Sequence, residues 1–411
     1  MSFASHWSDV AVAAGARAIS SCGDYLAATT LVLAFQQSGA GGTAVSGLLL
    51  AASVPAALLA PVAGRIADRV DSRTVLVVAG VAQAGVCTAL AFAGSPVLII
   101  ALVALLAAGL AITGPTLFAL LPDMVAPRDL PRASGINQTA GLLGLLVAPA
   151  LAGVLVGQFG VRVPLLLDAV SYLALVVAGL LIRTRRRGRP AGPADRPAWR
   201  LRDDRLVATM VIAVAAVVAG VGAINVIEVF FVRETLHASP TVFGFVSAAW
   251  TVGMVAGSLL FGRLPAGERD PGRLVRLSLL LMGLVCAMVT AGAGVWTVLI
   301  LVPLWVVAGS GNGGLNVCTS VVIAHRVPGE ARGRAYAVMG SAVQGAAMIG
   351  FLIGGPLVDR FEPRVLVFGA GVAGLVAVLG CVPAVRRAMR SEPPGSTVVP
   401  ARVLTGDSVG A

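Results

Sequence analysis

Long apolar runs alternate with short polar segments along the whole chain, and this alternation is its dominant pattern. Each run reaches about 20 residues, enough to cross a hydrocarbon core of about 30 Å as an α-helix. The pattern therefore predicts twelve membrane-spanning helices, over residues 12–36, 43–63, 74–94, 96–121, 133–156, 164–183, 206–232, 241–262, 274–293, 295–324, 334–357 and 365–385.

Composition agrees with this reading. The chain is 57% hydrophobic and only 12% charged, whereas soluble domains are about half apolar and about a quarter charged. A soluble core is excluded, and so is a large domain outside the membrane. The prediction is an all-α integral membrane protein whose direct environment is the lipid bilayer.

One long polar insert separates the sixth and seventh runs and divides the chain into two six-helix halves. Several residues of the first half recur in the second at the same spacing: Arg132, Phe159 and Arg162 correspond to Arg334, Phe361 and Arg364. Two parallel repeats predict two pseudo-symmetric six-helix bundles around a midplane cavity. The predicted organisation is an N-terminal bundle over 1–183, an Arg-rich linker over 184–205, a C-terminal bundle over 206–385 and a disordered tail over 386–411.

Arginine distribution predicts the orientation. All 30 basic residues are arginine, and most of them fall in alternate loops, on the side where both termini lie. Positive residues near helix ends are retained on the cytoplasmic side. We therefore expect a multi-pass protein of the cytoplasmic membrane with both termini inside, no removed signal peptide, and a monomeric state. The arginines form no basic face with stacking aromatics, so nucleic acid is not an expected partner.

A dense polar segment between the second and third runs carries a motif. It reads Gly64, then Asp68-Arg69, then Arg73 before the next apolar run. Charges this dense predict a tight turn at a membrane face. The spacing resembles the loop between the second and third helices of major facilitator superfamily transporters.

Two positions depart from the superfamily pattern, because Asp71 stands where Gly is usual and Ser72 where a basic residue is usual. The resemblance implies a gate on the cytoplasmic side. In the outward-open state, Asp68 would meet the start of the eleventh helix, and the arginines would meet Asp123 at the end of the fourth.

Acids inside apolar runs are the best pointers to function, because a carboxylate at the bilayer centre costs about 2.5 to 3.5 kcal/mol unless it faces water or a partner. Asp24 is about 18 Å into the first predicted helix and so near the midplane. It is the candidate for proton coupling or for substrate contact. The alternative is a structural acid that bonds the hydroxyls of Ser20 and Ser21.

Four further residues are proton or substrate candidates. Glu228 is expected near the outer end of the seventh helix with Asn225 one turn away on its face. Asp168 is expected just inside the outer rim, where a structural role is favoured. Asn137 is one of several embedded amides that either line a cavity or hydrogen-bond between helices.

The fifth helix carries small residues and a proline at Gly135, Gly144, Pro149 and Gly153. This resembles the Gly-Pro motif of proton-driven antiporters of the superfamily. It suits a bend at a helix interface, although generic packing explains it equally well. The family arginine of the fourth helix is missing, since residues 101–109 carry no charge. Together with the motifs around Asp24 and Asp168, its absence makes the chain more similar to the siderophore and macrolide exporter branch than to the sugar symporters.

Catalysis is not predicted, since His6, His237 and His325 are scattered and form no triad or metal cluster. No metal, cofactor or nucleotide-binding motif is expected. The predicted function is export of a small amphipathic compound, a drug or natural product, by antiport with protons. A proton-coupled importer of a small metabolite and a non-transporting membrane receptor remain the alternatives.

Overall fold

The computed structural model describes residues 5–126, 128–184, 200–201, 204–263, 271–328 and 331–390, and within these ranges it is entirely helical or irregular. The helices are α1 (Trp7–Gln37), α2 (Gly41–Arg69), α3 (Ser72–Phe92), α4 (Pro96–Met124), α5 (Leu130–Phe159), α6 (Arg162–Leu181), α7 (Arg205–Val221), α8 (Ile224–Phe230), the π-helical η2 (Phe231–Thr235), α9 (Pro240–Gly262), α10 (Pro271–Ala293), α11 (Val298–Arg326), α12 (Arg332–Val358) and α13 (Pro363–Arg390). Twelve segments of the described chain are long and apolar enough to span a membrane, which confirms the predicted fold class.

The polar segment after the second span is mostly helical, which corrects the prediction of a turn over its whole length. α2 continues to Arg69 and α3 begins at Ser72, so only two residues separate the helices. The Asp71 carboxylate accepts a hydrogen bond from the Arg73 N–H at 2.8 Å and thereby caps α3. An aspartate is a favoured cap at this position, which gives a physical reason for its presence where the superfamily has glycine.

The seventh span is broken into three pieces rather than continuous as predicted. α7 ends at Val221, α8 begins at Ile224, and η2 completes the span. Gly222 and Ala223 form the break and lie against α12, where a Cβ on Gly350 would come within 2.6 Å of the Gly222 carbonyl carbon. Close backbone packing from α12 therefore accompanies the interruption.

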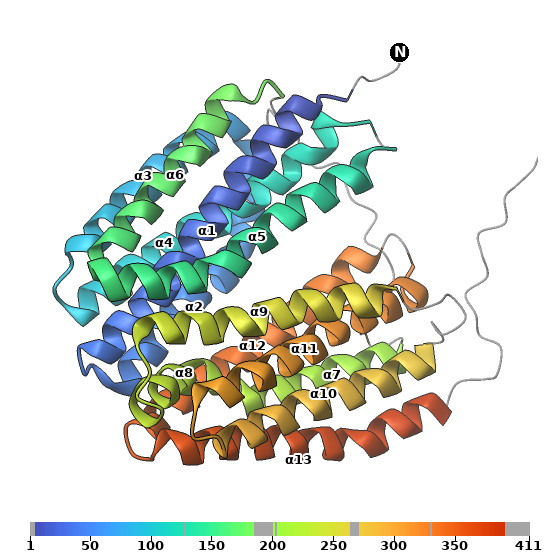
Figure 1. Cartoon of the computed structure of the whole chain (residues 1–411). Helices are drawn as coiled ribbons and strands as arrows, with labels where there is room; N and C mark the ends of the chain where they lie inside the picture. The colour runs from blue at the N-terminus through green and yellow to red at the C-terminus, as the bar shows by residue number, and fades with distance from the viewer. Residues whose placement is uncertain are drawn as a thin grey trace, which may run out of the picture.

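The helices form two bundles, an N-half of α1–α6 and a C-half of α7–α13 (Figure 1). We call the face where α1 begins and α13 ends the terminal side, and the opposite face the distal side. The two bundles lie together at the distal side and diverge toward the terminal side (Figure 1). α5 lies beside α9 and α2 beside α12 across the boundary between the halves.

Glycine contacts close the distal side. Gly153 of α5 and Gly244 of α9 face each other so closely that a Cβ on either would lie 3.0 Å from the Cα of the other. At the second seam, a Cβ on Gly355 of α12 would lie 2.7 Å from the carbonyl oxygen of Gly42 on α2. Ser46 of α2 donates to the Phe351 carbonyl at 2.5 Å nearby.

Polar contacts reinforce the same side. Asp359, which ends α12, accepts hydrogen bonds from the Gly42 N–H at 2.5 Å, from the Thr43 N–H at 3.0 Å, and from the Thr43 hydroxyl. Gln36 of α1 donates to Glu234 at 3.0 Å and accepts from Arg233 at 3.2 Å, both on η2. These hydrogen bonds between the halves, all from described residues, therefore lie together at the distal side.

At the terminal side, the polar contacts join helices within the same half. Thr184, just after α6, donates from its N–H and its hydroxyl to Asp9 of α1, at 2.9 and 2.7 Å. Asp204 caps α7 and accepts from Arg326 of α11 at 2.9 Å. Most of the predicted linker and the tail beyond Arg390 lie outside the described residues, and α13 runs five residues past the predicted end of the last span.

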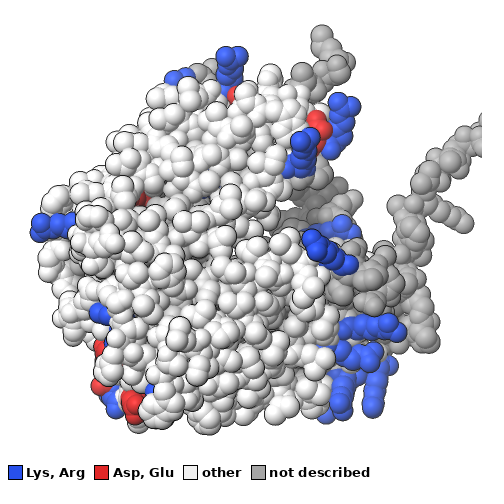
Figure 2. All heavy atoms as spheres, viewed as in Figure 1, with Lys and Arg blue, Asp and Glu red and all other residues white. Residues whose placement is uncertain are grey.

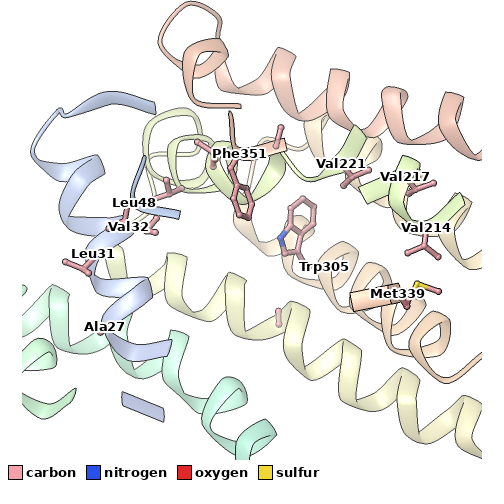
Figure 3. Packing of buried hydrophobic residues seen from close by; sticks show 14 of the residues in the cluster. Ala27, Leu31, Val32, Leu48, Val214, Val217, Val221, Trp305, Met339 and Phe351 are labelled. Carbon is pink, nitrogen blue, oxygen red and sulfur yellow. The ribbon is translucent and has the colours of Figure 1, made fainter. Parts of the chain in front are cut away.

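The surface suits a bilayer. Figure 2 shows arginines gathered at the end where α13 finishes, with a broad, almost uncharged band between that end and the opposite one. Buried apolar side chains from both halves form one cluster, in which Figure 3 labels Leu31 and Leu48 of the N-half and Trp305 and Phe351 of the C-half. The packing at the distal side is therefore continuous between the bundles.

Candidate functional site

A cavity of about 410 Å³ lies in the N-half beside α1. That volume is within the range of about 300 to 1,000 Å³ typical of small-molecule sites. One wall is polar and comes from α1; the others are apolar and come from α2, α4 and α6. The polar wall consists of Arg17, Ser20, Ser21, Asp24 and Tyr25. The apolar walls include Leu48, Leu49, Leu106, Leu110, Leu117 and Leu175, and Leu31 of α1 continues them beyond the polar residues.

Asp24 reaches the polar wall from two residues beyond the centre of α1. Its carboxylate accepts a hydrogen bond from the Tyr172 hydroxyl of α6 at 2.5 Å. Tyr172 itself is 0% exposed, so the bond is shielded on its α6 side, while Asp24 remains partly accessible from the cavity. Its local polarity thus comes from a neighbouring helix as well as from its own.

Asp168 lies one turn before Tyr172 on α6 and is 0% exposed. It accepts from the Ser171 hydroxyl at 3.0 Å and from the Cys87 thiol of α3 at 2.9 Å. A Cβ added to Gly23 of α1 would collide with Asp168 and Ser171. The glycine beside Asp24 therefore lets α1 lie directly on the second carboxyl.

Asp24 and Asp168 are thus gathered in one buried polar cluster between α1, α3 and α6. In the described part of the chain, no ion pair joins either acid to an arginine. Two carboxylates in one buried cluster without an ion-paired cation are costly, and one exchangeable proton removes much of that cost. The arrangement is chemically suited to binding and releasing a proton.

Glu228 forms a separate site in the C-half, on α8 after the break in the seventh span. It accepts from the indole N–H of Trp305 on α11 at 2.8 Å. Trp305 in turn meets Trp250 of α9 edge-to-face, with ring centroids 6.4 Å apart. Asn225 is exposed and donates to the Gly222 carbonyl at 3.1 Å, so it supports the break rather than Glu228.

The residues of the fifth-helix motif make different contacts in the structure. Gly144 packs on α1, where its Cβ would come within 2.6 Å of the Cys22 nitrogen. Pro149 and Gly153 pack on Gly244 across the boundary between the halves. Gly135 has open space around it. Asn137 is 1% exposed, and neither of its amide atoms has a hydrogen-bond partner among the residues that the structure describes.

The predicted gate residues lie at the terminal side, away from the cavity polar wall. Arg73 is half-buried and Asp123 is exposed at the end of α4. Gly64, Asp68 and Arg69 belong to the last turns of α2, and their side chains lie outside the described part of the structure.

Sequence reasoning missed several members of the cavity wall and of the two polar clusters, namely Arg17, Cys87, Ser171, Tyr172 and Trp305. A helical signal was available for two of them, since Ser171 and Tyr172 lie three and four residues after Asp168 on the same face. Cys87 and Trp305 carry no such signal, because only packing between distant helices brings them to their partners.

The family model described as Major Facilitator Superfamily matches residues 13–229 and 210–406, one stretch for each half. The chain belongs to the major facilitator superfamily. Together with its twelve spans, this membership makes it a multi-pass membrane transporter and not an enzyme.

Several solved transporter structures share the fold over most of their length. A bacterial homologue of the iron transporter ferroportin, in an inward-facing state, has a TM-score of 0.73 at 16% identity, covering 92% of this chain and 99% of that one. A bacterial homologue of the human lysosomal transporter Spinster, inward-facing and unoccupied, gives 0.70 at 14% identity, with 93% and 95% covered. The peptide transporter POT in complex with sulfate gives 0.69 at 16%, also with 93% and 95% covered. No curated protein matches the sequence.

Proposed function

We propose that this transporter exports a small amphipathic compound, a drug or natural product, across the cytoplasmic membrane in exchange for protons. The cavity beside α1 carries the proposal: a compound with an apolar body and a polar group fits a chamber whose one wall is polar and whose others are leucine-rich. The sequence likeness to the siderophore and macrolide exporter branch supports the outward direction.

The coupling carboxyl in this proposal is Asp24. It is the acid that borders the cavity, and it touches the buried cluster that includes Tyr172 and Asp168. Proton binding at Asp24 and substrate binding would therefore take place in the same cavity, so that one event can follow release of the other. One charge moving down 100 mV supplies about 2.3 kcal/mol, enough for about a 50-fold gradient of a neutral substrate.

The terminal side is proposed to face the cytoplasm, because the arginines gather there. The distal seams would then keep the exterior closed while the cavity is accessible from inside. In the alternate state, the last turns of α2, with Asp68 and Arg69, would close the terminal side together with Arg73 and Asp123. An Asp68→Asn variant should therefore transport slowly while binding substrate almost normally, and wild-type transport rates in this variant would remove the gate.

Transport into inverted membrane vesicles tests the function. Vesicles that contain the wild-type protein should accumulate an amphipathic compound from a panel when the interior is acidified, and a protonophore should abolish the accumulation. Asp24→Asn keeps the side-chain shape but removes the titratable group, so it should abolish proton-driven uptake at normal protein levels. Glu362→Gln is the matched control, because Glu362 is an exposed acid outside both clusters.

The alternatives give different results in the same assay. Proton-driven uptake into whole cells, with none into inverted vesicles, would identify an importer. Binding without movement in either direction would identify a receptor. Undiminished proton-driven transport by Asp24→Asn would leave export possible but remove Asp24 from the coupling step.

A further inference from the structure

Arg17 is a half-buried cation in the cavity wall, and the proton-coupling mechanism gives it no role. It projects from α1 into the chamber two turns before Asp24. Its Nε atom is fully buried, and no hydrogen-bond partner for it exists among the described residues. A cation in a membrane-spanning segment is costly unless it faces water, a counter-ion or a ligand.

The surroundings hold the guanidinium in position, and its charge acts on Asp24 electrostatically without forming an ion pair with it. Its central carbon lies 4.9 Å from the centre of the Phe118 ring of α4, in a cation–π contact. On the α5 side, a Cβ on Gly141 would lie 3.3 Å from Nε, so this glycine leaves room for the side chain. In the described chain no carboxylate forms an ion pair with Arg17.

The cation–π contact between Arg17 and Phe118 leaves the guanidinium able to bind an anionic ligand. An aromatic ring covers one face of the planar guanidinium, whereas its N–H donors point outward in the plane of the group. Those donors match the two oxygens of a carboxylate. Asp24 lies seven residues further along α1, about 10 Å along the axis, so an anion at Arg17 would not be pressed against the coupling carboxyl.

We propose that Arg17 binds the anionic group of the substrate, and that the transported class is therefore amphipathic organic acids. The acid group would sit at Arg17, Ser20 and Ser21 would flank it, and the apolar body would lie along Leu106 and Leu110 of α4. This inference rests on the proposed transport function and assigns its substrate class.

Equilibrium binding to the purified protein tests the assignment with a matched pair of probes, radiolabelled naphthylacetic acid and its amide, naphthylacetamide. The two have nearly the same shape and differ in charge. Hydrogen bonds to charged groups are worth about 1.5 to 3 kcal/mol, so the acid should bind at least about tenfold more tightly than the amide.

Variants locate the source of that preference. Arg17→Gln should bring the acid-to-amide affinity ratio close to one, and Arg17→Lys should keep part of it. Arg132→Gln is the control, because Arg132 is an exposed arginine that also stacks on an aromatic ring, that of Trp7 at 5.0 Å, away from the cavity. It should keep the wild-type ratio.

Several outcomes would overturn the assignment. These are equal binding of acid and amide by the wild-type protein, no binding of either probe, and a preference that persists in Arg17→Gln. Should Arg17→Gln fail to fold, the wild-type ratio and Arg17→Lys still decide. Transport of the amide without preference for the acid would remove the Arg17 assignment but keep the export function. Tight binding of the acid with no transport under any proton gradient would keep the Arg17 assignment but remove the export function.

Discussion

Gly153 of α5 and Gly244 of α9 meet backbone to backbone across the boundary between the two halves. A Cβ on Gly153 would come within 2.6 Å of the Pro240 carbonyl oxygen, and a Cβ on Gly244 would collide with the Pro149 carbonyl oxygen. Thr241 also donates to the Gly153 carbonyl at 3.2 Å. This contact fixes the distance between the bundles at the distal side.

Gly244→Ala is therefore expected to open the distal side. Overpacking typically costs about 1 to 3 kcal/mol, which would shift the ratio of distal-closed to distal-open molecules by about 5- to 150-fold. The distance between spin labels at Gln37 and Phe361 should lengthen in pulsed electron resonance measurements. Gly135→Ala is the control from the same predicted motif, because its Cβ meets open space; equal distances in all three proteins would contradict the seam.

Asp359 provides a second, charge-dependent contact. Burial raises its pKa, but the bonds from the Thr43 hydroxyl and from the Gly42 and Thr43 N–H groups outweigh burial, and the pKa falls below the ordinary value of 3.8. Because the pKa of Asp359 is lowered, its contact stabilises the closed distal side fully at pH values above the ordinary pKa of 3.8. This stabilisation is lost as the pH falls through the lowered pKa.

Asp359→Asn should thus lengthen the same label distance at neutral pH. The difference from the wild-type protein should stay constant between about pH 5 and pH 8, and it should shrink only below the ordinary value. Glu362→Gln, in the same loop, should behave like the wild-type protein. A difference that disappears between pH 8 and pH 5 would show that another group controls this contact.

Tyr172→Phe removes the hydroxyl that bonds Asp24 but keeps the ring that packs in the core. If Asp24 couples protons to transport, the pH at which uptake into inverted vesicles is half-maximal should move in this variant. Tyr336→Phe is the matched control, because its exposed hydroxyl bonds only the Ser320 carbonyl of α11 among the contacts described. An unchanged pH profile for Tyr172→Phe would separate this hydroxyl from the coupling step.

Trp305→Phe should destabilise the C-half, because the Glu228 carboxyl would lose its indole donor. An unsatisfied buried acceptor costs about 1 to 3 kcal/mol, so the temperature of unfolding in detergent should fall. Trp296→Phe, at a position 83% exposed, should change it little. Combining Trp305→Phe with Glu228→Met should cost less than the two single changes together; strict additivity would mean that the bond contributes nothing.

The sequence was sufficient for the spans and for the depth of Asp24, because both depend on runs of about 20 residues and on rise per residue. It was insufficient where a contact joins distant helices. The thiol of Cys87 reaches Asp168 only because α3 packs on α6. Likewise, Gly222 is one of 50 glycines, and its role at the break in the seventh span follows from α12 packing against it.

Arg17 shows the same limit from another direction. Along α1 it lies two turns from Asp24, and the sequence indicates only that the two do not pair within the helix. The binding role proposed for Arg17 depends on Phe118 of α4 and Gly141 of α5, which hold the guanidinium at the cavity wall. A local pattern identifies a charge inside a membrane span, whereas its neighbours from other helices decide what it can bind.

The glycine seams have a consequence for how the transporter could be tuned. Contacts between uncharged backbones are insensitive to ionic strength, unlike exposed charged pairs. Since glycine stands on both sides of each seam, neither helix has a smaller residue with which to compensate an enlarged partner. The seams therefore act as fixed stops that set the closed geometry. Finer adjustment of the balance between closed and open states can come from the polar contacts of Asp359 and Gln36, which single substitutions can weaken by degrees.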